Sequence, residues 1–327
     1  MVLTIDQVGR QLHSARDLHS ISRAMKALSA VRIRHSRRAV ESLERYGRTV
    51  ELALQVALTH RPSGIRLTDE DVGSRAGAVV FGSDMGLAGR FNIRIAEYAL
   101  EHLDELHPEA GDRFMLAVGS RVEGALKGAG ARVAGTFTAP DSIEAIVQTV
   151  QELLLAIEEL RARRRVERLY LFYNHYHSGA TYRPHMVHLL PLFEAWLTGL
   201  EERPWPTPVR PRFRVSWERL FSELVREHLF ISLFSAAARS QAAENASRLA
   251  SMEAAERRIV ERIDELRGRF NQQRQQKITE ELLDLVTGFL ASEEEEEEEA
   301  AQDESHEATV PVDPTIRVST ASDHRRP

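Results

Sequence analysis

Four histidines lie close together in LYLFYNHYHSGATYRPHMVHLLPL (residues 169–192), and imidazole is a frequent ligand of zinc. They are His175, His177, His185 and His188. The HxH spacing can ligate a metal ion, because it places two rings on the same side of a strand. No carboxylate lies within residues 174–190 to complete such a site. We therefore expect exposed surface histidines, with a metal site as the alternative.

A glycine-containing loop, Gly82–Gly86 (GSDMG), follows an apolar run and precedes a helical stretch, the usual place of a phosphate-binding loop. It matches neither GxGxxG nor GxxxxGK[ST], and it has no lysine to meet a phosphate. Nor does it match the GxSxG nucleophile elbow. The pattern favours a tight strand-to-helix turn without catalysis.

The most conspicuous charged stretch is residues 23–38, which carries six cations and no acid: Arg23, Lys26, Arg32, Arg34, Arg37 and Arg38. Like charges four residues apart on a helix repel one another. We expect this surface to meet an acidic partner, against the alternative of a solvated coiled-coil face. Nucleic-acid binding is disfavoured, because no aromatic residues alternate with the cations and no DNA-binding motif accompanies them.

The bulk composition narrows the class of protein further. The 327 residues contain no cysteine, which excludes disulfides, thiolate metal sites and cysteine nucleophiles and fits a cytosolic protein. No apolar run approaches the ~20 residues that span a bilayer, and no secretory signal is recognisable. The net charge of -6 arises from residues 292–327, which hold twelve acids and three arginines, whereas the rest of the chain has 40 basic and 37 acidic residues.

Two long helices are expected to position these groups. Residues 4–60 predict the first, with Thr4 and Gln7 at capping-box spacing. Leu18, Ile21 and Met25, with Leu28 after them, step by three and four residues, which predicts a coiled-coil seam. A second helix is expected over residues 216–291, where no proline interrupts the chain.

Short apolar runs alternate with helical stretches near 88–106, 120–129 and 141–164, which predicts a small, mostly parallel sheet covered by helices. The fold class is therefore α/β plus a long coiled coil, with an antiparallel pair of terminal helices flanking a small α/β domain. The expected segments are an N-terminal coiled-coil helix (1–62), an α/β domain (75–200), a proline-rich linker (201–215), a C-terminal coiled-coil helix (216–291) and a disordered acidic tail (292–327).

The second predicted helix outlasts the first by about 19 residues, or ~28 Å. This overhang, residues 273–291, carries a narrow apolar stripe of Ile278, Leu282, Leu285 and Phe289. Exposing such a stripe is costly, so we expect it to fit a socket in another protein. The glutamate run that follows opposes the helix dipole, so we expect the helix to fray after Ala291.

Four segments resemble the gamma subunit of F-type ATP synthase. They are SISRAMKALSAVRIR (20–34), FGSDMGLAGRFN (81–92), residues 169–192 and NQQRQQKITEELLDLVTG (271–288), in the order of that family. Ala88 and Arg90 stand where the family usually has cysteine and glycine, and Phe289 replaces its usual alanine. With the acidic C-terminal extension, these departures suggest a divergent or alternative-type branch, with a different coupling ion or direction.

The resemblance implies a non-catalytic central-stalk rotor subunit that couples rotation of an ion-driven membrane ring to ATP synthesis or hydrolysis in an alpha/beta head. The implied partners are the alpha, beta and epsilon subunits and the c-ring, at the cytoplasmic face of a bacterial inner membrane. No cofactor is implied, since ATP binds the partners, and no nucleic acid.

The resemblance also implies contact surfaces. The six cations of residues 23–38 would meet levers of the beta subunits. A bearing in the head would hold Arg274, Gln275, Ile278, Thr279, Glu281, Leu282 and Leu285, and the ring would contact Arg212, Phe213 and Arg214. Two rival functions stay open: a nucleotide-binding α/β enzyme and a coiled-coil scaffold protein.

Overall fold

The computed structural model describes residues 4–63, 65, 75–107, 109, 113–179 and 181–307. The chain divides into two compact units, residues 15–261 and residues 1–14 with 262–327, which we describe separately. The elements along the chain are α1 (Ile5–Thr59), β1 (Ala76–Phe81), α2 (Phe91–Leu106), β2 (Arg113–Val118), α3 (Ser120–Gly128), β3 (Val133–Phe137), α4 (Ile143–Arg164), β4 (Arg168–Ser178), β5 (Thr181–Leu190), α5 (Glu194–Glu201) and α6 (Trp217–Glu307).

A five-stranded sheet with the order β3-β2-β1-β4-β5 forms the centre of the larger unit. Strands β1 to β4 are parallel, and β5 pairs antiparallel with β4. Helices α2, α3 and α4 connect successive parallel strands, as such connections require. The predicted small, mostly parallel sheet is confirmed.

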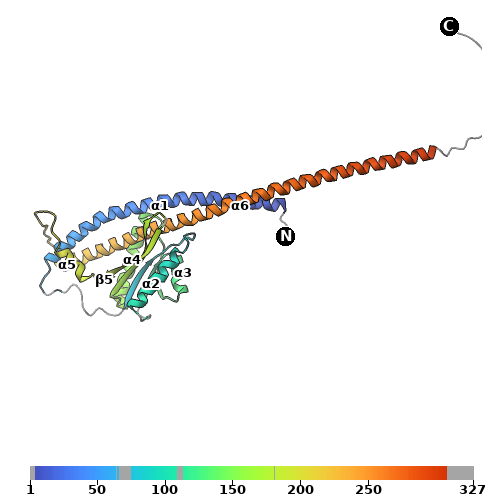
Figure 1. Ribbon diagram of the computed structural model, residues 1–327. Helices are drawn as coiled ribbons and strands as arrows, with labels where there is room; N and C mark the ends of the chain where they lie inside the picture. The colour runs from blue at the N-terminus through green and yellow to red at the C-terminus, as the bar shows by residue number, and fades with distance from the viewer. Residues whose placement is uncertain are drawn as a thin grey trace, which may run out of the picture. The chain divides into compact units, whose positions relative to one another are not determined.

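Each face of the sheet is covered by helices (Figure 1). Ile95 and Leu103 of α2 pack with Leu126 of α3 against one face. On the other face, α4 packs with α6, and α1 adds partly buried residues. Strands covered on both faces need apolar residues throughout, which explains why β1 and β2 read as unbroken apolar runs rather than as alternating patterns.

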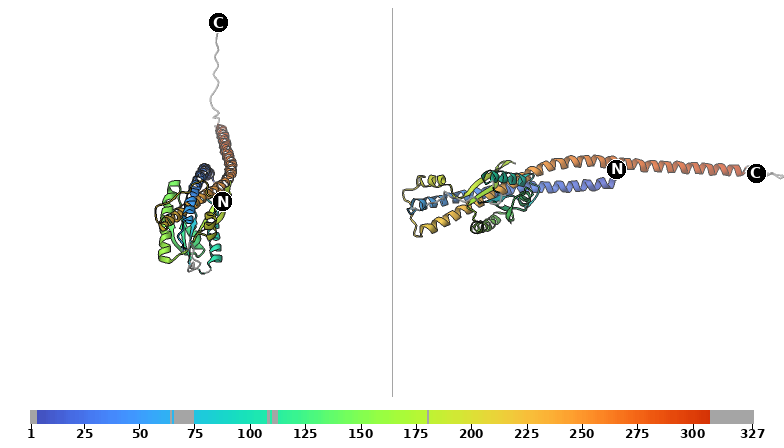
Figure 2. Two further views of the ribbon diagram at one scale, coloured as in Figure 1. Left: turned by 90° about the vertical axis from the view of Figure 1, so that its left-hand side faces the viewer. Right: turned by 90° about the horizontal axis from the view of Figure 1, so that it is seen from below.

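Helices α1 and α6 lie alongside each other in antiparallel directions within the larger unit (Figure 2). At the start of α6, Trp217 Nε1 donates to the carbonyl of Ala57 in α1. Further along, Ser22 Oγ lies 3.1 Å from the Met252 carbonyl. Because α1 residue numbers fall as α6 numbers rise, the predicted antiparallel pairing is confirmed.

The seam of this helix pair differs from the predicted one. Leu18, Ile21 and Leu28 are each more than half exposed, and Met25 is only half-buried. Up to residue 49, the buried α1 positions are instead Val8, Leu12, Ala15, Ser22, Ser29, Ile33 and Ser36, a heptad pattern displaced around the helix. The α6 stretch opposite residues 22–36, between Gln241 and Met252, contains the buried alanines Ala242, Ala243 and Ala246. Small residues let the two backbones approach closely, so residue size fixes this seam more than hydrophobicity does.

In the smaller unit, the start of α1 packs on α6. Val8 and Leu12 are buried, as are Ile263 and Leu266. A Cβ on Gly9 would lie 3.6 Å from the Phe270 ring, so this aromatic ring covers the first turns of α1. Beyond Phe270, nearly every described α6 side chain up to residue 292 is exposed.

Helix α6 continues to Glu307, sixteen residues beyond its expected end at Ala291. The expectation that the acidic segment leaves the helix immediately was therefore wrong for residues 292–307. Glutamate and alanine have high intrinsic helix propensity, which offsets repulsion of a few tenths of a kcal/mol per like-charge pair. The remainder of the predicted tail, 308–327, lies outside the described residues.

Among the described residues, no helix combines the length and the apolar character that crossing a bilayer requires.

Candidate functional site

The loop between β1 and α2 is a turn held by its own side chains. Ser83 N–H donates to Asn92 Oδ1 at 2.9 Å. The carboxylate of Asp84 accepts from the N–H groups of Ser120 (2.6 Å) and Ala139 (2.8 Å). A Cβ on Gly82 would lie 2.3 Å from Val122 Cβ, so glycine is required there. Since a carboxylate already takes N–H groups that a phosphate would need, the geometry is that of a structural turn.

A buried polar cluster on α6 joins this loop to the helix pair. Ser247 Oγ donates to the Ala88 carbonyl at 2.6 Å. Arg248 is 3% exposed, pairs with Glu244 at 2.6 Å and reaches the Gly86 carbonyl at 3.5 Å. Burial raises the pKa of Glu244, although the Arg248 guanidinium acts in the opposite direction. Sequence reasoning missed this cluster, whose signal is the charged pair inside the alanine-rich stretch SQAAENASRLA.

The six predicted cations on α1 separate into two groups. Arg23, Arg34, Arg37 and Arg38 are exposed. Lys26 is half-buried and forms an ion pair of 2.6 Å with Glu256 of α6. Arg32 is also half-buried, and its charge opposes the rise that burial causes in the pKa of Glu244. The sequence predicted that all six cations meet an acidic partner chain, whereas Lys26 has an acidic partner within this chain, 230 residues away.

Next to the exposed arginines, α1 presents an apolar surface that sequence reasoning assigned to the seam. Leu18, Ile21 and Leu28 are 53–55% exposed, and Val31 is 41% exposed. Within the described structure these side chains are exposed, so another chain could contact them. Their three-and-four spacing marks one face of a helix but cannot show which of two such faces turns inward.

The end of α6 carries the largest group of exposed apolar side chains. Its members are Ile278, Leu282, Leu283, Leu285, Val286, Phe289 and Leu290, each 48–70% exposed. At about 100° per residue, Leu283, Val286 and Leu290 extend the predicted stripe sideways by about a quarter-turn. The apolar face is therefore wider than the narrow stripe expected.

The polar residues predicted for the same surface share this segment. Arg274, Gln275, Thr279 and Glu281 are all exposed. Thr279 Oγ1 donates to the Gln275 carbonyl at 2.9 Å, and Glu281 lies 3.8 Å from Lys277, a spacing of four residues. At about 100° per residue, Gln275 and Thr279 lie within the apolar face, whereas Arg274 and Glu281 lie at its edge.

The third predicted surface lies between α5 and α6, in a stretch without helix or strand. Arg212 and Arg214 are exposed, whereas Phe213 is half-buried, with its ring edge-on to His60 at 5.6 Å between centroids. Phe213 therefore packs on the end of α1, and the two arginines flank it.

The histidines do not gather into a metal site. The ring centroids of His175 and His185 are 6.1 Å apart. The His188 ring is tilted against the Phe193 ring, with 4.4 Å between their centroids. His175 and His188 are half-buried rather than exposed as expected. Arg239 of α6 lies 3.3 Å from His175 Nδ1, and the rings of Tyr170 and Phe193 lie against His188. Within the described ranges, no group of three or more histidine, aspartate or glutamate side chains could hold a metal ion.

Comparison with known proteins identifies the family of the chain. A family model described as ATP synthase matches residues 4–291. The chain belongs to this family. Relatives named ATP synthase gamma chain identify the branch of the family as the gamma subunits: one from Alkaliphilus metalliredigens is 27% identical over 297 residues, and one from Bacteroides fragilis is 26% identical over 299.

These gamma-chain relatives span nearly the same length. The alignment with the Alkaliphilus metalliredigens protein covers 88% of this chain and 98% of the relative. One structure is described as the rotor of the Euglena gracilis mitochondrial ATP synthase. Its matching chain has a TM-score of 0.54 at 16% identity, and the match covers 84% of this chain and 98% of that chain. A second structure, of the OSCP/F1/c-ring assembly, gives 0.55 at 16% identity, with 96% and 99% coverage. At this identity the structural likeness establishes the fold alone.

The gamma-family match ends at residue 291, so the glutamate run lies beyond it. In this gamma chain the extension continues the same helix, α6, up to Glu307. The departures at Ala88 and Arg90 fall in the loop that the α6 cluster holds: the Ala88 carbonyl accepts from Ser247, and Arg90 pairs with Glu97 at 3.3 Å.

Proposed function

We propose that this gamma-family chain is the central-stalk rotor subunit of an F-type ATP synthase and transmits rotation between a membrane ring and an alpha/beta head. The observation that carries the proposal is the end of α6, where seven large apolar side chains are exposed within residues 278–290. An exposed apolar surface of this size is typical of a contact with another chain.

The partner of this segment is proposed to be the hexameric head of alpha and beta subunits. A single helix with apolar residues over about 160° of its circumference fits a narrow sleeve lined by apolar loops. The polar face, which includes Arg274 and Glu281, would keep contact with the sleeve weak enough to permit turning.

Rotation must also be carried along the chain without slippage. The buried seam of small residues holds α1 and α6 together, and hydrogen bonds such as Ser36 to Gln241 (2.7 Å) fix their register. The Glu244–Arg248 pair and Ser247 bind α6 to the β1–α2 loop, so a force on the sheet reaches the helix pair through buried contacts. Buried hydrogen-bonded charges resist displacement, because separating them leaves an unpaired charge in the interior.

Coupling follows from the asymmetry of the surface that the head would meet. The exposed arginines of α1 and its exposed apolar row lie on different faces of the helix, so each turn would present different chemistry to each catalytic site. Differences in binding free energy among the sites would then be linked to rotation. Arg34, Arg37 and Arg38 are proposed contacts for acidic levers of the beta subunits.

At the other end, Arg212 and Arg214 beside Phe213 are proposed to contact the membrane ring, with an epsilon subunit as a further partner. The chain would be peripheral to the membrane, at the cytoplasmic face in a bacterium.

Co-purification tests the proposal. The chain is expressed with the alpha and beta subunits of its own organism, and ATP hydrolysis by the purified complex is measured with and without it. We expect a stoichiometric complex whose sustained hydrolysis requires this chain. Arg34→Gln with Arg38→Gln should lower the hydrolysis rate, whereas Arg121→Gln, an exposed arginine on α3, should not. Failure to co-purify with alpha and beta subunits would favour the scaffold alternative.

A further inference from the structure

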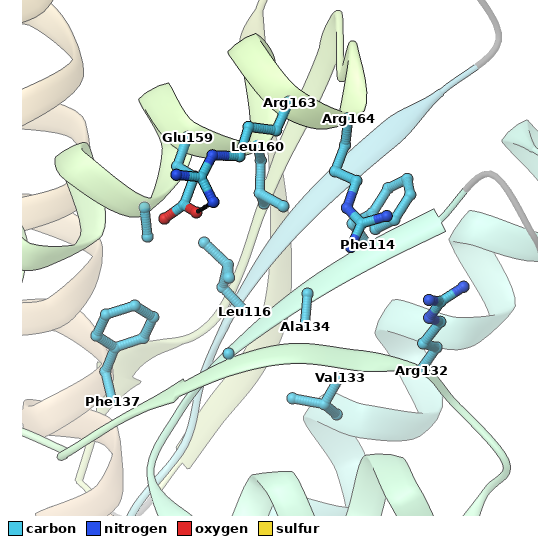
Figure 3. A pocket seen from close by; sticks show the side chains of 12 residues that line it. Phe114, Leu116, Arg132, Val133, Ala134, Phe137, Glu159, Leu160, Arg163 and Arg164 are labelled. Carbon is cyan, nitrogen blue, oxygen red and sulfur yellow. Dashed lines mark ion pairs between the residues drawn. The ribbon is translucent and has the colours of Figure 1, made fainter.

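A cavity that the rotor function does not use lies between α4 and the edge strand β3 (Figure 3). Its volume is about 580 Å³, within the range of small-molecule sites. The floor consists of buried Phe114, Leu116 and Leu160. The rim carries three arginines, of which Arg132 precedes β3 and Arg163 and Arg164 end α4.

Two of these arginines converge on one aromatic ring. The guanidinium carbons of Arg132 and Arg164 are each 5.9 Å from the centroid of the Phe114 ring. Attraction to the ring face holds cations in such positions. Since both distances are measured from the same centroid, the two guanidinium carbons are no more than twice 5.9 Å apart. A separation up to this bound allows both guanidinium groups to bind one diphosphate, and a single phosphate can bridge them when both lie on the same side of the ring.

The charge at the rim is unbalanced. Glu159 is the one acid lining the cavity, and its carboxylate pairs with Arg163 at 2.9 Å, as Figure 3 shows. Within the part of the chain that the structure describes, no carboxylate pairs with Arg132 or Arg164. Basic residues at the end of α4 interact favourably with the helix dipole, which accounts for the position of Arg164. The dipole does not account for Arg132, which comes from a different element and faces the same cavity.

We propose that this cavity binds an organic phosphate. Arg132 and Arg164 would bind the phosphoryl oxygens, because guanidinium groups donate paired hydrogen bonds that match phosphate geometry. The apolar floor and the half-buried Phe137 would cover the organic part of the ligand. The same phosphate chemistry occurs in a free nucleoside diphosphate and in the headgroup of an acidic phospholipid.

Calorimetric titration of the purified full-length chain distinguishes these sources. The probes are ADP, pyrophosphate and vesicles of phosphatidylcholine with or without phosphatidic acid. Saturable binding of ADP, with weaker binding of pyrophosphate, identifies a free organic phosphate. Binding only to vesicles that contain phosphatidic acid identifies a lipid headgroup. Absence of binding to every probe overturns the proposal.

Variants locate the binding. The double substitution Arg132→Gln with Arg164→Gln should raise Kd at least tenfold, and so should Ala134→Glu, which adds a carboxylate to the exposed side of β3 in the cavity. The matched control is Arg94→Gln: Arg94 also lies over an aromatic ring, 5.4 Å from the Tyr182 centroid, but does not line this cavity. Unchanged affinity in both cavity variants, or an equal loss in the control, would overturn the assignment. Because the isolated chain is measured, the result is independent of assembly with a head or a ring.

Discussion

At the scale of single residues, the helix pair depends on small polar groups that occupy apolar positions. Ser22, Ser29 and Ser36 recur every seven residues on the buried side of α1. The Ser36 hydroxyl lies 2.7 Å from Gln241 Oε1, while Gln241 Nε2 donates to the Pro140 carbonyl at 3.0 Å. Since the amide nitrogen is already a donor to Pro140, Oε1 must accept from Ser36.

Ser36→Ala therefore leaves a buried acceptor without its donor. We expect the free energy of unfolding to fall by about 1–2 kcal/mol, measured by denaturant titration of the isolated chain. Ser42→Ala, on the exposed side of α1, is the control and should change stability by less than about 0.5 kcal/mol. Equal effects of the two substitutions would show that the bond to Gln241 has no energetic importance.

Histidines give the larger unit a pH dependence. Burial first, and then the charge of Arg239, lowers the pKa of His175, and burial with Arg168 lowers the pKa of His188. In the unfolded chain both regain a pKa of about 6.5. As the pH falls below this value, the unfolded chain takes up protons that the folded chain does not, so stability is lost.

We expect the midpoint of thermal unfolding to fall between pH 7.5 and pH 5.5. The double substitution His175→Gln with His188→Gln should reduce this fall, whereas His35→Gln, on the exposed side of α1, should leave it unchanged. An identical pH dependence in the double variant would contradict the account.

Residue-level prediction from sequence succeeded where the pattern was local and failed where the partner was distant. The cations of residues 23–38 could be grouped by spacing alone. The Lys26–Glu256 pair and the Glu244–Arg248 cluster could not, because they depend on which turns of α1 and α6 face each other and the loop.

At the scale of elements, the end of α6 stands out because its large apolar side chains are exposed, which is unusual for a helix that has no partner. Leu282→Asp with Leu285→Asp should weaken association with the head at least tenfold, since each leucine buried in a partner contributes about 1.5–3 kcal/mol. Recovery of alpha and beta subunits with an affinity-tagged chain measures this effect.

The matched control for that variant is Glu280→Gln, on the opposite side of the same helix. It should assemble as the unchanged chain does. If the double aspartate variant also assembles normally, this surface is not the head contact.

The acidic continuation of α6 tests a different part of the account. Removal of residues 293–327 should leave assembly and ATP hydrolysis within about twofold of the full chain, because the proposed contacts end before Ser292. A shorter control chain that ends at Thr279 should fail to assemble normally. Loss of assembly in the first truncation would show that the acidic segment belongs to the interface.

Element boundaries were predicted well where turn residues marked them, as for the helices after β2 and β3. Helix α2 begins at Phe91 rather than near residue 88, because Leu87 and Gly89 adopt left-handed backbone conformations with φ of 66° and 56°. The short helix α5 was missed. The coiled-coil seam was misplaced because the exposed residues Leu18, Ile21 and Leu28 have the same three-and-four spacing as the buried positions.

At the scale of the whole molecule, the fold followed from a simple order of segments: a long helix, alternating strands and helices, and a second long helix. The antiparallel pairing of α1 and α6 could be inferred because the sheet domain lies between them in sequence. The surface that faces another chain could not be inferred, since amphipathic patterns do not distinguish a partner helix of the same chain from a partner in another chain.

Direct observation of rotation tests the central claim. The assembled complex is fixed through its head, and a bead is attached to this chain at Met85→Cys, a unique label because the chain has no cysteine and Met85 is 56% exposed. On addition of ATP, the account predicts continuous rotation of the bead in one direction. A bead that stays still while the same preparation hydrolyses ATP would contradict it.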